Sequence, residues 1–179
     1  FELNVANLSA YERNLNLLDP IGLAEYKYQG EGVDVMGQGN SVAFGSVGGQ
    51  TLNATSNSSL QFLVGLGGGD DYQITQNNTV AVIADFGSDG SDRIYAPGID
   101  LESDYTAIIS VDNKHLVIGN TLTNQEFWVP NWKDDQFKIE TYNLAGTVYT
   151  HTFLANTVAS LPNYLGNLSF SDLQALTGS

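Results

Sequence analysis

Short apolar segments separated by glycine are the feature that most limits how this chain can fold. Between Tyr26 and Leu66, the segments Val33–Val35, Ser41–Phe44 and Gln61–Val64 alternate with glycine pairs and polar runs. Such short segments, rich in β-branched and aromatic residues, are typical of strands in all-β proteins. The 19 glycines against 4 prolines favour tight turns over extended linkers. We therefore expect an all-β fold, either a short-stranded β-solenoid (a β-roll) or a sandwich-like arrangement, rather than a parallel α/β sheet.

The rest of the chain continues this pattern and adds short terminal helices. Ser9–Glu12 reads as a capping box before an apolar helical face, and Ser171–Leu176 can form a second short helix. Nothing between them is long enough to be a linker, so we expect a single mostly-β domain over residues 1–179. Further strands are expected at Val80–Ile83, Tyr105–Ile109, His115–Ile118, Glu126–Val129, Phe137–Glu140 and Thr147–Thr150.

Two glycine–aspartate turns carry the most informative pattern. Gly87–Tyr95 fits the nonapeptide G-G-x-G-x-D-x-U-x, where U is a large apolar residue, with serine at the second position, and Leu66–Tyr72 is a looser copy. In this pattern glycines let the backbone turn sharply and direct carbonyl oxygens inward. The aspartate supplies a charged ligand, and the apolar residue two positions later starts a buried strand. Stacked coils of this kind bind calcium between successive turns. The predicted calcium ligands are Gly67, Gly69, Asp70, Asp71, Asp85, Gly87, Asp89, Gly90 and Asp92.

Residues 65–149 resemble the RTX family of secreted bacterial calcium-binding proteins. Val82–Phe86 followed by Gly90–Ile94 is similar to the "I-x-D-F…G-x-D-x-I" segment that often closes an RTX repeat block. The segments Leu116–Ile118, Val129–Trp132, Phe137–Thr141 and Gly146–Thr147 resemble the β-rich region that accompanies such repeats. The resemblance implies secretion and calcium-dependent folding.

Three departures from the family pattern limit this implication. His115 and Ala145 stand where the family usually has aspartate. Asp71 and Asp92 are 21 residues apart (92 − 71), rather than the roughly 18 of two nonapeptides. We therefore expect one or two degenerate calcium sites instead of a regular array.

The charge balance restricts the partners of the chain. It has 20 acidic and 6 basic residues, a net charge of −14, which would repel nucleic-acid phosphates and attract cations. It contains no cysteine, which excludes disulfides and thiolate sites. No run approaches the roughly 20 apolar residues of a membrane span, so no membrane span is expected.

Enzymatic chemistry is not indicated by the sequence. His115 and His151 each fall in an apparent strand, without a recognisable nucleophile turn, and Gly39–Ala43 misses the G-x-S-x-G elbow. The acidic pairs Asp70–Asp71 and Asp134–Asp135 suit turn or calcium roles better than glycoside hydrolysis. Aromatic residues could form a platform for sugar rings, although filling the core between sheets is the favoured interpretation; these residues are Trp128, Trp132, Tyr142, Tyr149 and Phe153.

Together these features predict a secreted or cell-surface structural or adhesive module that binds calcium and is not an enzyme. It would belong to a surface layer, a filament, or a biofilm or adhesion protein, and we expect homo-oligomers or polymers whose formation depends on calcium. Two alternatives stay open. One is the C-terminal calcium-dependent secretion and folding region of a secreted enzyme, and the other is a carbohydrate-binding module with a polysaccharide ligand.

Overall fold

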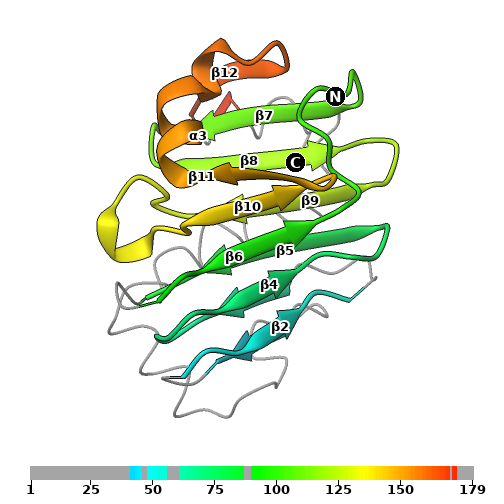
Figure 1. The fold of residues 1–179 in the computed structure, drawn as a ribbon. Coiled ribbons are helices and arrows are strands. Elements are labelled where there is room, and N and C mark those ends of the chain that lie inside the picture. The colour runs from blue at the N-terminus through cyan, green and yellow to red at the C-terminus, as the bar shows by residue number, and fades with distance from the viewer. Residues whose placement is uncertain (1–40, 46–47, 56–60, 87–89, 170, 173–179) are drawn as a thin grey trace.

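A computed structural model describes residues 41–45, 48–55, 61–86, 90–169 and 171–172. These residues form a mostly β fold of two mixed sheets, with one short α-helix (Figure 1). The predicted mostly-β class is therefore confirmed. The predicted helix starting at Ser9–Glu12, the predicted strand Val33–Val35 and most of the predicted C-terminal helix lie outside the described residues. In the described part of the chain, no helix has the length and apolarity needed to cross a membrane.

The larger sheet contains seven strands and the smaller sheet five, and neither closes on itself. In order across the larger sheet the strands are β1 (Ser41–Phe44), β3 (Gln61–Val64), β5 (Thr79–Ala84), β9 (Gln125–Val129), β8 (His115–Asn120), β7 (Thr106–Val111) and β12 (Tyr164–Leu168). Across the smaller sheet they are β2 (Thr51–Asn53), β4 (Asp71–Gln73), β6 (Arg93–Ala96), β10 (Thr141–Leu144) and β11 (Thr147–Thr150).

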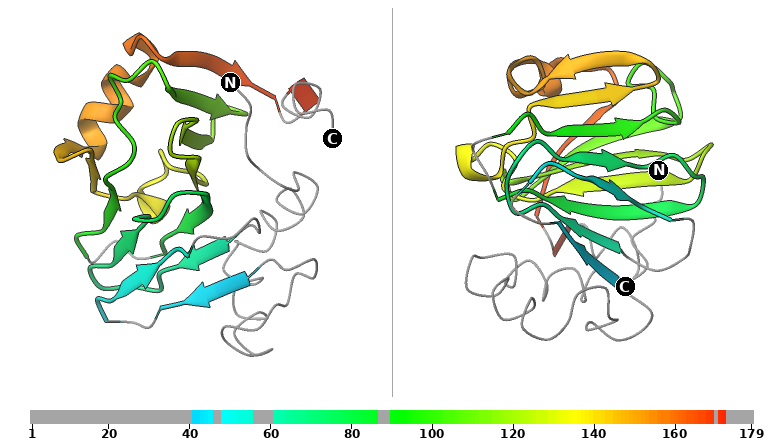
Figure 2. Two further views of the ribbon diagram at one scale, coloured as in Figure 1. Left: turned by 90° about the vertical axis from the view of Figure 1, so that its right-hand side faces the viewer. Right: turned by 60° about the horizontal axis from the view of Figure 1, so that its bottom comes forward.

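The first six strands alternate between the two sheets, and within each sheet they pair in parallel. Gln61 pairs with Ser41 on one side and Ala81 on the other, so each pass of the chain advances by 20 residues. In the smaller sheet Asp71 pairs with Thr51 and Arg93, which are 20 and 22 residues away. This constant register places each turn between the sheets directly beside the turn of the preceding pass (Figure 2, left).

The second half of the chain extends both sheets and closes one end of the stack. β9 and β10 continue the parallel order, whereas β7, β8 and β9 form antiparallel pairs, as do β10 and β11. The helix α3 (His151–Thr157) follows β11, and its N-cap residue Thr150 accepts a hydrogen bond from the Phe153 amide. Two 3-10 turns, η1 (Asp135–Phe137) and η2 (Val158–Ser160), complete the described elements.

The seven-stranded sheet buries both of its faces. Along β3, Leu63 packs into a core cluster shared with the smaller sheet, whereas Phe62 and Val64 belong to a second cluster on the opposite face. This alternation follows from the two-residue period of a strand. Because both faces are apolar, β3, β5, β7, β8 and β9 are buried along their whole length.

The strand predictions succeed in the larger sheet and fail in part of the smaller one. Ser41–Phe44, Gln61–Val64 and Thr147–Thr150 are strands with the predicted bounds, and the other predicted strands of the larger sheet shift by one or two residues. The prediction of a strand over Phe137–Glu140 is wrong. Asp134 caps the 3-10 turn η1 there by accepting from the Gln136 amide, and the strand begins only at Thr141.

Candidate metal site

The turns that lead from the larger sheet to the smaller one stack on each other. They lie at residues 45–50, 65–70 and 85–92, after β1, β3 and β5, with 46–47 and 87–89 outside the described residues. The backbones of adjacent turns approach so closely that a Cβ atom at Gly90 would collide with the Gly68 carbonyl group. Gly68 itself has a φ of +83°, and a Cβ atom there would collide with the backbone of Gly48 and Gly49. Glycine is therefore required where the turns touch.

Three aspartates of the second and third turns meet inside this stack. Asp70, Asp85 and Asp92 are each no more than 1% exposed, and one carboxylate oxygen of each lies within 4.8 Å of the others. Asp85 comes directly after β5, while Asp70 and Asp92 come directly before β4 and β6. Parallel pairing of these strands brings the three residues together.

A ladder of side-chain acceptors crosses the same turns. The Gln50 amide donates to Asp70 Oδ1 at 2.8 Å, the Asp70 amide to Asp92 Oδ1 at 2.8 Å, and the Asp92 amide to Glu140 Oε2 at 2.9 Å. Each of these four residues immediately precedes a strand of the smaller sheet. The ladder fixes one oxygen of Asp70 and one of Asp92, and so determines where the second oxygen of each carboxylate lies.

Those second oxygens lack partners. Asp70 Oδ2 and Asp92 Oδ2 are fully buried and accept no hydrogen bond. Asp85 Oδ2 accepts from the Tyr72 hydroxyl at 2.5 Å. A Cβ atom at Gly65 would collide with Asp70 Oδ2, Asp85 Oδ2 and the Tyr72 hydroxyl, so these groups converge beside the bare Gly65 backbone. Because a buried carboxylate oxygen without a partner is costly, the arrangement lacks a positively charged or hydrogen-bonding group at this point.

Burial and mutual repulsion perturb the acids of the site. Burial above all, with the charges of Asp85 and Glu140, raises the pKa of Asp92 to about 7, despite the stabilising hydrogen bond from the Asp70 amide. Burial and the charge of Asp85 also raise the pKa of Asp70. The pKa of Tyr72 is raised by burial and by the neighbouring carboxylates, so this hydroxyl stays protonated and donates. Three ionised carboxylates at this spacing need a counter-ion, since two unit charges 4 Å apart repel by about 4 kcal/mol at an effective dielectric constant of about 20.

The structure brings together only part of the predicted ligand set. Asp70, Asp85 and Asp92 form the triad, and Gly67, Gly69 and Gly90 lie in the turns around it. Gly87 and Asp89 lie outside the described residues.

Asp71 does not contribute to the triad. It begins β4 and points to the other face, where both of its carboxylate oxygens bind Arg93, at 2.9 Å to Nε and 2.7 Å to Nη2. This pair lowers the pKa of Asp71. Comparing Asp71 with Asp92 is therefore the wrong register: Asp70 is the residue equivalent to Asp92, 22 positions away.

Sequence reasoning missed four residues of the site. Gln50 and Glu140 are the first and last members of the acceptor ladder, Tyr72 binds Asp85, and Gly65 leaves the space between the carboxylates. The signal for Tyr72 was present in the motif, since it occupies the apolar position two residues after the aspartate. Glu140 could not be identified this way, because it reaches the site only through pairing of β10 with β6.

The histidines and the large aromatic residues have structural positions. His115 is buried, and its Nδ1 accepts from the Asn131 amide, so it is not the half-exposed residue that we expected. Trp128, Trp132 and Tyr142 are at most 1% exposed and fill the core, which confirms the favoured interpretation for these three. Tyr149 is half-buried and lies against the exposed ring of Phe153.

Comparison with known proteins adds no assignment. No protein-family model matches the chain, and no curated protein matches it significantly in sequence. The resemblance to the RTX family stays a prediction that depends on the motif residues. The chemistry of the site must therefore be inferred from its own geometry.

Proposed function

We propose that the chain is a calcium-binding β module in which one ion joins the turns that contain Asp70, Asp85 and Asp92. The observation that carries the proposal is the pair of buried oxygens, Asp70 Oδ2 and Asp92 Oδ2, that have no hydrogen-bond partner beside a third buried carboxylate. A cation at this point would be a ligand for both oxygens and would cancel most of the repulsion among the three acids.

Calcium fits the donor set better than a transition metal. The triad offers only carboxylate oxygens, and oxygen ligands select calcium, magnesium or manganese, whereas zinc and copper prefer histidine and cysteine ligands. Calcium takes six to eight oxygens in irregular geometry, so carbonyl groups of the glycine turns and water could complete its shell. Magnesium requires a nearly ideal octahedron, which a set fixed by a backbone ladder is less able to provide.

The fold that follows from this proposal is a short β-roll. Support comes from the alternation of the first six strands between two sheets and from their parallel pairing at 20 and 22 residues per pass. These passes are longer than the roughly 18 residues of two nonapeptides. We attribute the difference to turns that hold fewer glycine–aspartate ligands than a regular RTX repeat, which agrees with a single degenerate site.

Within this proposal the module is extracellular and structural or adhesive, and has no catalytic role. Sites of weak calcium affinity are used where calcium reaches millimolar concentration, which is outside cells. The acidic and cysteine-free composition suits such an environment, because the ion replaces disulfides as the element that stabilises the fold.

Thermal unfolding with and without calcium tests the proposal. We expect the melting temperature to rise with calcium concentration and to fall on chelation, because an ion that binds only the folded state stabilises it. Calorimetric titration should show that Asp92→Ala abolishes calcium binding, whereas Asp135→Ala leaves it unchanged, since Asp135 is exposed in η1. Equal losses in the two variants, or a melting temperature insensitive to calcium, would overturn the assignment.

A further inference from the structure

Two lysines stand out in this acidic chain because they have no carboxylate partner. Arg93 pairs with Asp71, and Lys138 lies 3.6 Å from Glu140. In the part of the chain that the structure describes, neither Lys114 nor Lys133 makes an ion pair. Both line the same cleft.

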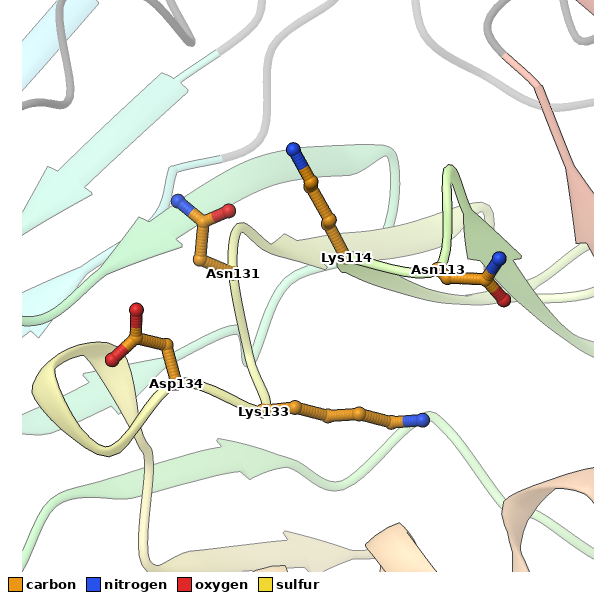
Figure 3. Close-up of a pocket in the computed structure, with 5 residues that line it drawn as sticks. All are labelled: Asn113, Lys114, Asn131, Lys133 and Asp134. Atoms are coloured by element: carbon orange, nitrogen blue, oxygen red, sulfur yellow. The ribbon is translucent and has the colours of Figure 1, made fainter.

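This lysine cleft, formed by Asn113, Lys114, Asn131, Lys133 and Asp134, has a volume of about 340 Å³. Its two sides are the turn between β7 and β8 and the segment that follows β9. Figure 3 shows that Lys114 and Lys133 leave these two segments in different directions, so their ammonium groups are not adjacent. Such an arrangement suits a ligand that carries more than one negative group.

The backbone around the cleft is held in place. The Trp132 amide donates to the Lys114 carbonyl oxygen at 3.1 Å, and the Asn131 amide donates to His115 Nδ1 at 3.2 Å. Asp134 is the one acid in the lining, and its Oδ1 accepts from the Gln136 amide. The cleft is therefore formed in the isolated chain and carries more positive than negative side chains.

The opposite end of the same strand carries the complementary charge. The acidic loop, residues Asp100–Asp104, immediately precedes β7, and its three acids Asp100, Glu102 and Asp104 are exposed. Buried Leu101 anchors the loop, and Asn163 Nδ2 donates to the carbonyl oxygens of Leu101 and Ser103 at 2.9 and 2.8 Å. Because β7 has six residues, it separates the loop from the turn at Lys114 by about 20 Å.

We infer that the lysine cleft of one copy binds the acidic loop of another copy, so that copies join head to tail along the direction of β7. Contact between two different surfaces of the same molecule does not close on itself unless the rotation happens to form a ring, and it therefore produces chains of copies. The inference deepens the proposed structural role and rests on it, but the contact does not involve the triad.

The net charge of −14 opposes association, and salt decides which effect prevails. Repulsion between whole copies is screened beyond about 10 Å at 0.1 M salt, whereas ion pairs in contact are still felt. Solvent-exposed ion pairs are individually weak. We therefore expect a dissociation constant on the order of 1 mM for one contact, with cooperative gain only when copies are held at a surface.

Sedimentation of charge-reversed variants tests the inference. Association of the native chain at about 0.1 M salt should weaken roughly tenfold or more at about 1 M salt. The pair Lys114→Glu with Lys133→Glu should abolish it, and so should the pair Glu102→Lys with Asp104→Lys. Mixing the two doubly reversed proteins should restore association, because each then presents a surface complementary to the other. Lys138→Gln, outside the cleft, is the matched control and should leave association unchanged.

The same samples separate this inference from the proposed function. Asp134→Asn removes the acid of the cleft while keeping a capping oxygen, and should strengthen association. A calcium-dependent melting temperature without restoration on mixing would overturn the head-to-tail contact alone. Restoration on mixing without a calcium response would overturn the metal site alone. A monomeric native chain whose cleft instead binds a uronic-acid polysaccharide, with loss of binding in Lys114→Glu, would assign the cleft to carbohydrate and overturn self-association.

Discussion

Replacing Asp92 with asparagine distinguishes a metal ligand from a purely structural acid. The change preserves size and keeps the oxygen that accepts from the Asp70 amide at 2.8 Å. It places an NH₂ group where the unpartnered Oδ2 lies, facing the carboxylates of Asp70 and Asp85. Without calcium, the variant thus removes a buried charge and gains a donor. With calcium, it loses a ligand.

The magnitude follows from the pKa of Asp92, which is about 7 in the folded chain against an ordinary value of 3.8. A carboxyl group whose folded pKa is raised destabilises the fold progressively as pH rises from 3.8 to about 7, and the full cost is present above that. Three pKa units correspond to about 4 kcal/mol. Coulomb repulsion at 4.8 Å and an effective dielectric constant of about 20 gives a similar value, roughly 3.5 kcal/mol for each pair of charges.

We therefore expect Asp92→Asn to raise the free energy of unfolding of the metal-free chain by about 1–3 kcal/mol at pH 8, after allowance for desolvation of the amide. The native chain should gain about 2.7 kcal/mol at a calcium concentration 100 times its Kd, and the variant should gain nothing. Urea unfolding in EDTA and in calcium measures both quantities. Asp135→Asn is the control and should stay within about 0.5 kcal/mol of native. A variant equally less stable than native in both conditions would refute the reasoning.

Three further outcomes follow from the same contacts. Gly65→Ala should remove the calcium response and lower stability, because its methyl group would collide with Asp70, Asp85 and Tyr72, whereas Gly48→Ala, with open space around it, should keep the response; melting curves compare them. Burial lowers the pKa of His115 to about 4, and its Nδ1 accepts from the Asn131 amide, so the unfolded chain binds a proton first as pH falls. The contribution of His115 is complete above pH 6.5 and is lost as pH falls to about 4, at a cost of at most about 3 kcal/mol, and His115→Asn should flatten this decline in urea titrations at successive pH values. Trp132→Ala should destabilise the chain by about 3–5 kcal/mol in the same assay, since the residue is 1% exposed; a surface platform for sugars would instead show normal stability and lost glycan binding.

Much of the larger sheet could be predicted because its strands bury both faces. In β5 the run Val80–Ile83 is apolar throughout and needs no knowledge of its neighbours to be identified as a strand. By contrast, β2 and β4 have three residues each and bury a single central side chain, Leu52 or Tyr72. One buried residue gives no periodicity, so these strands form only because the parallel neighbours supply their hydrogen bonds.

The candidate site was predictable in chemistry but not in register. The glycine–aspartate pattern identified Asp85 and Asp92 as ligands, because a turn between stacked strands places the aspartate next to the backbone. The choice between Asp70 and Asp71 depends on which of the two faces inward. A one-residue shift exchanges the faces of a strand, and only the pairing of Asp71 with Arg93 decides it. Glu140 depends on contacts 48 residues apart along the chain.

Calcium content after native purification is the most direct measurement of the proposed metal site. The chain is dialysed against micromolar free calcium and analysed for bound metal, with Asp92→Asn and Asp135→Asn prepared in parallel. We expect about one tightly held calcium per chain in the native protein and in Asp135→Asn, and none above background in Asp92→Asn, because Asp92 supplies a ligand oxygen that no other group replaces. Equal calcium content in all three proteins, or none in any of them at millimolar calcium, would contradict the assignment of the triad as a calcium site.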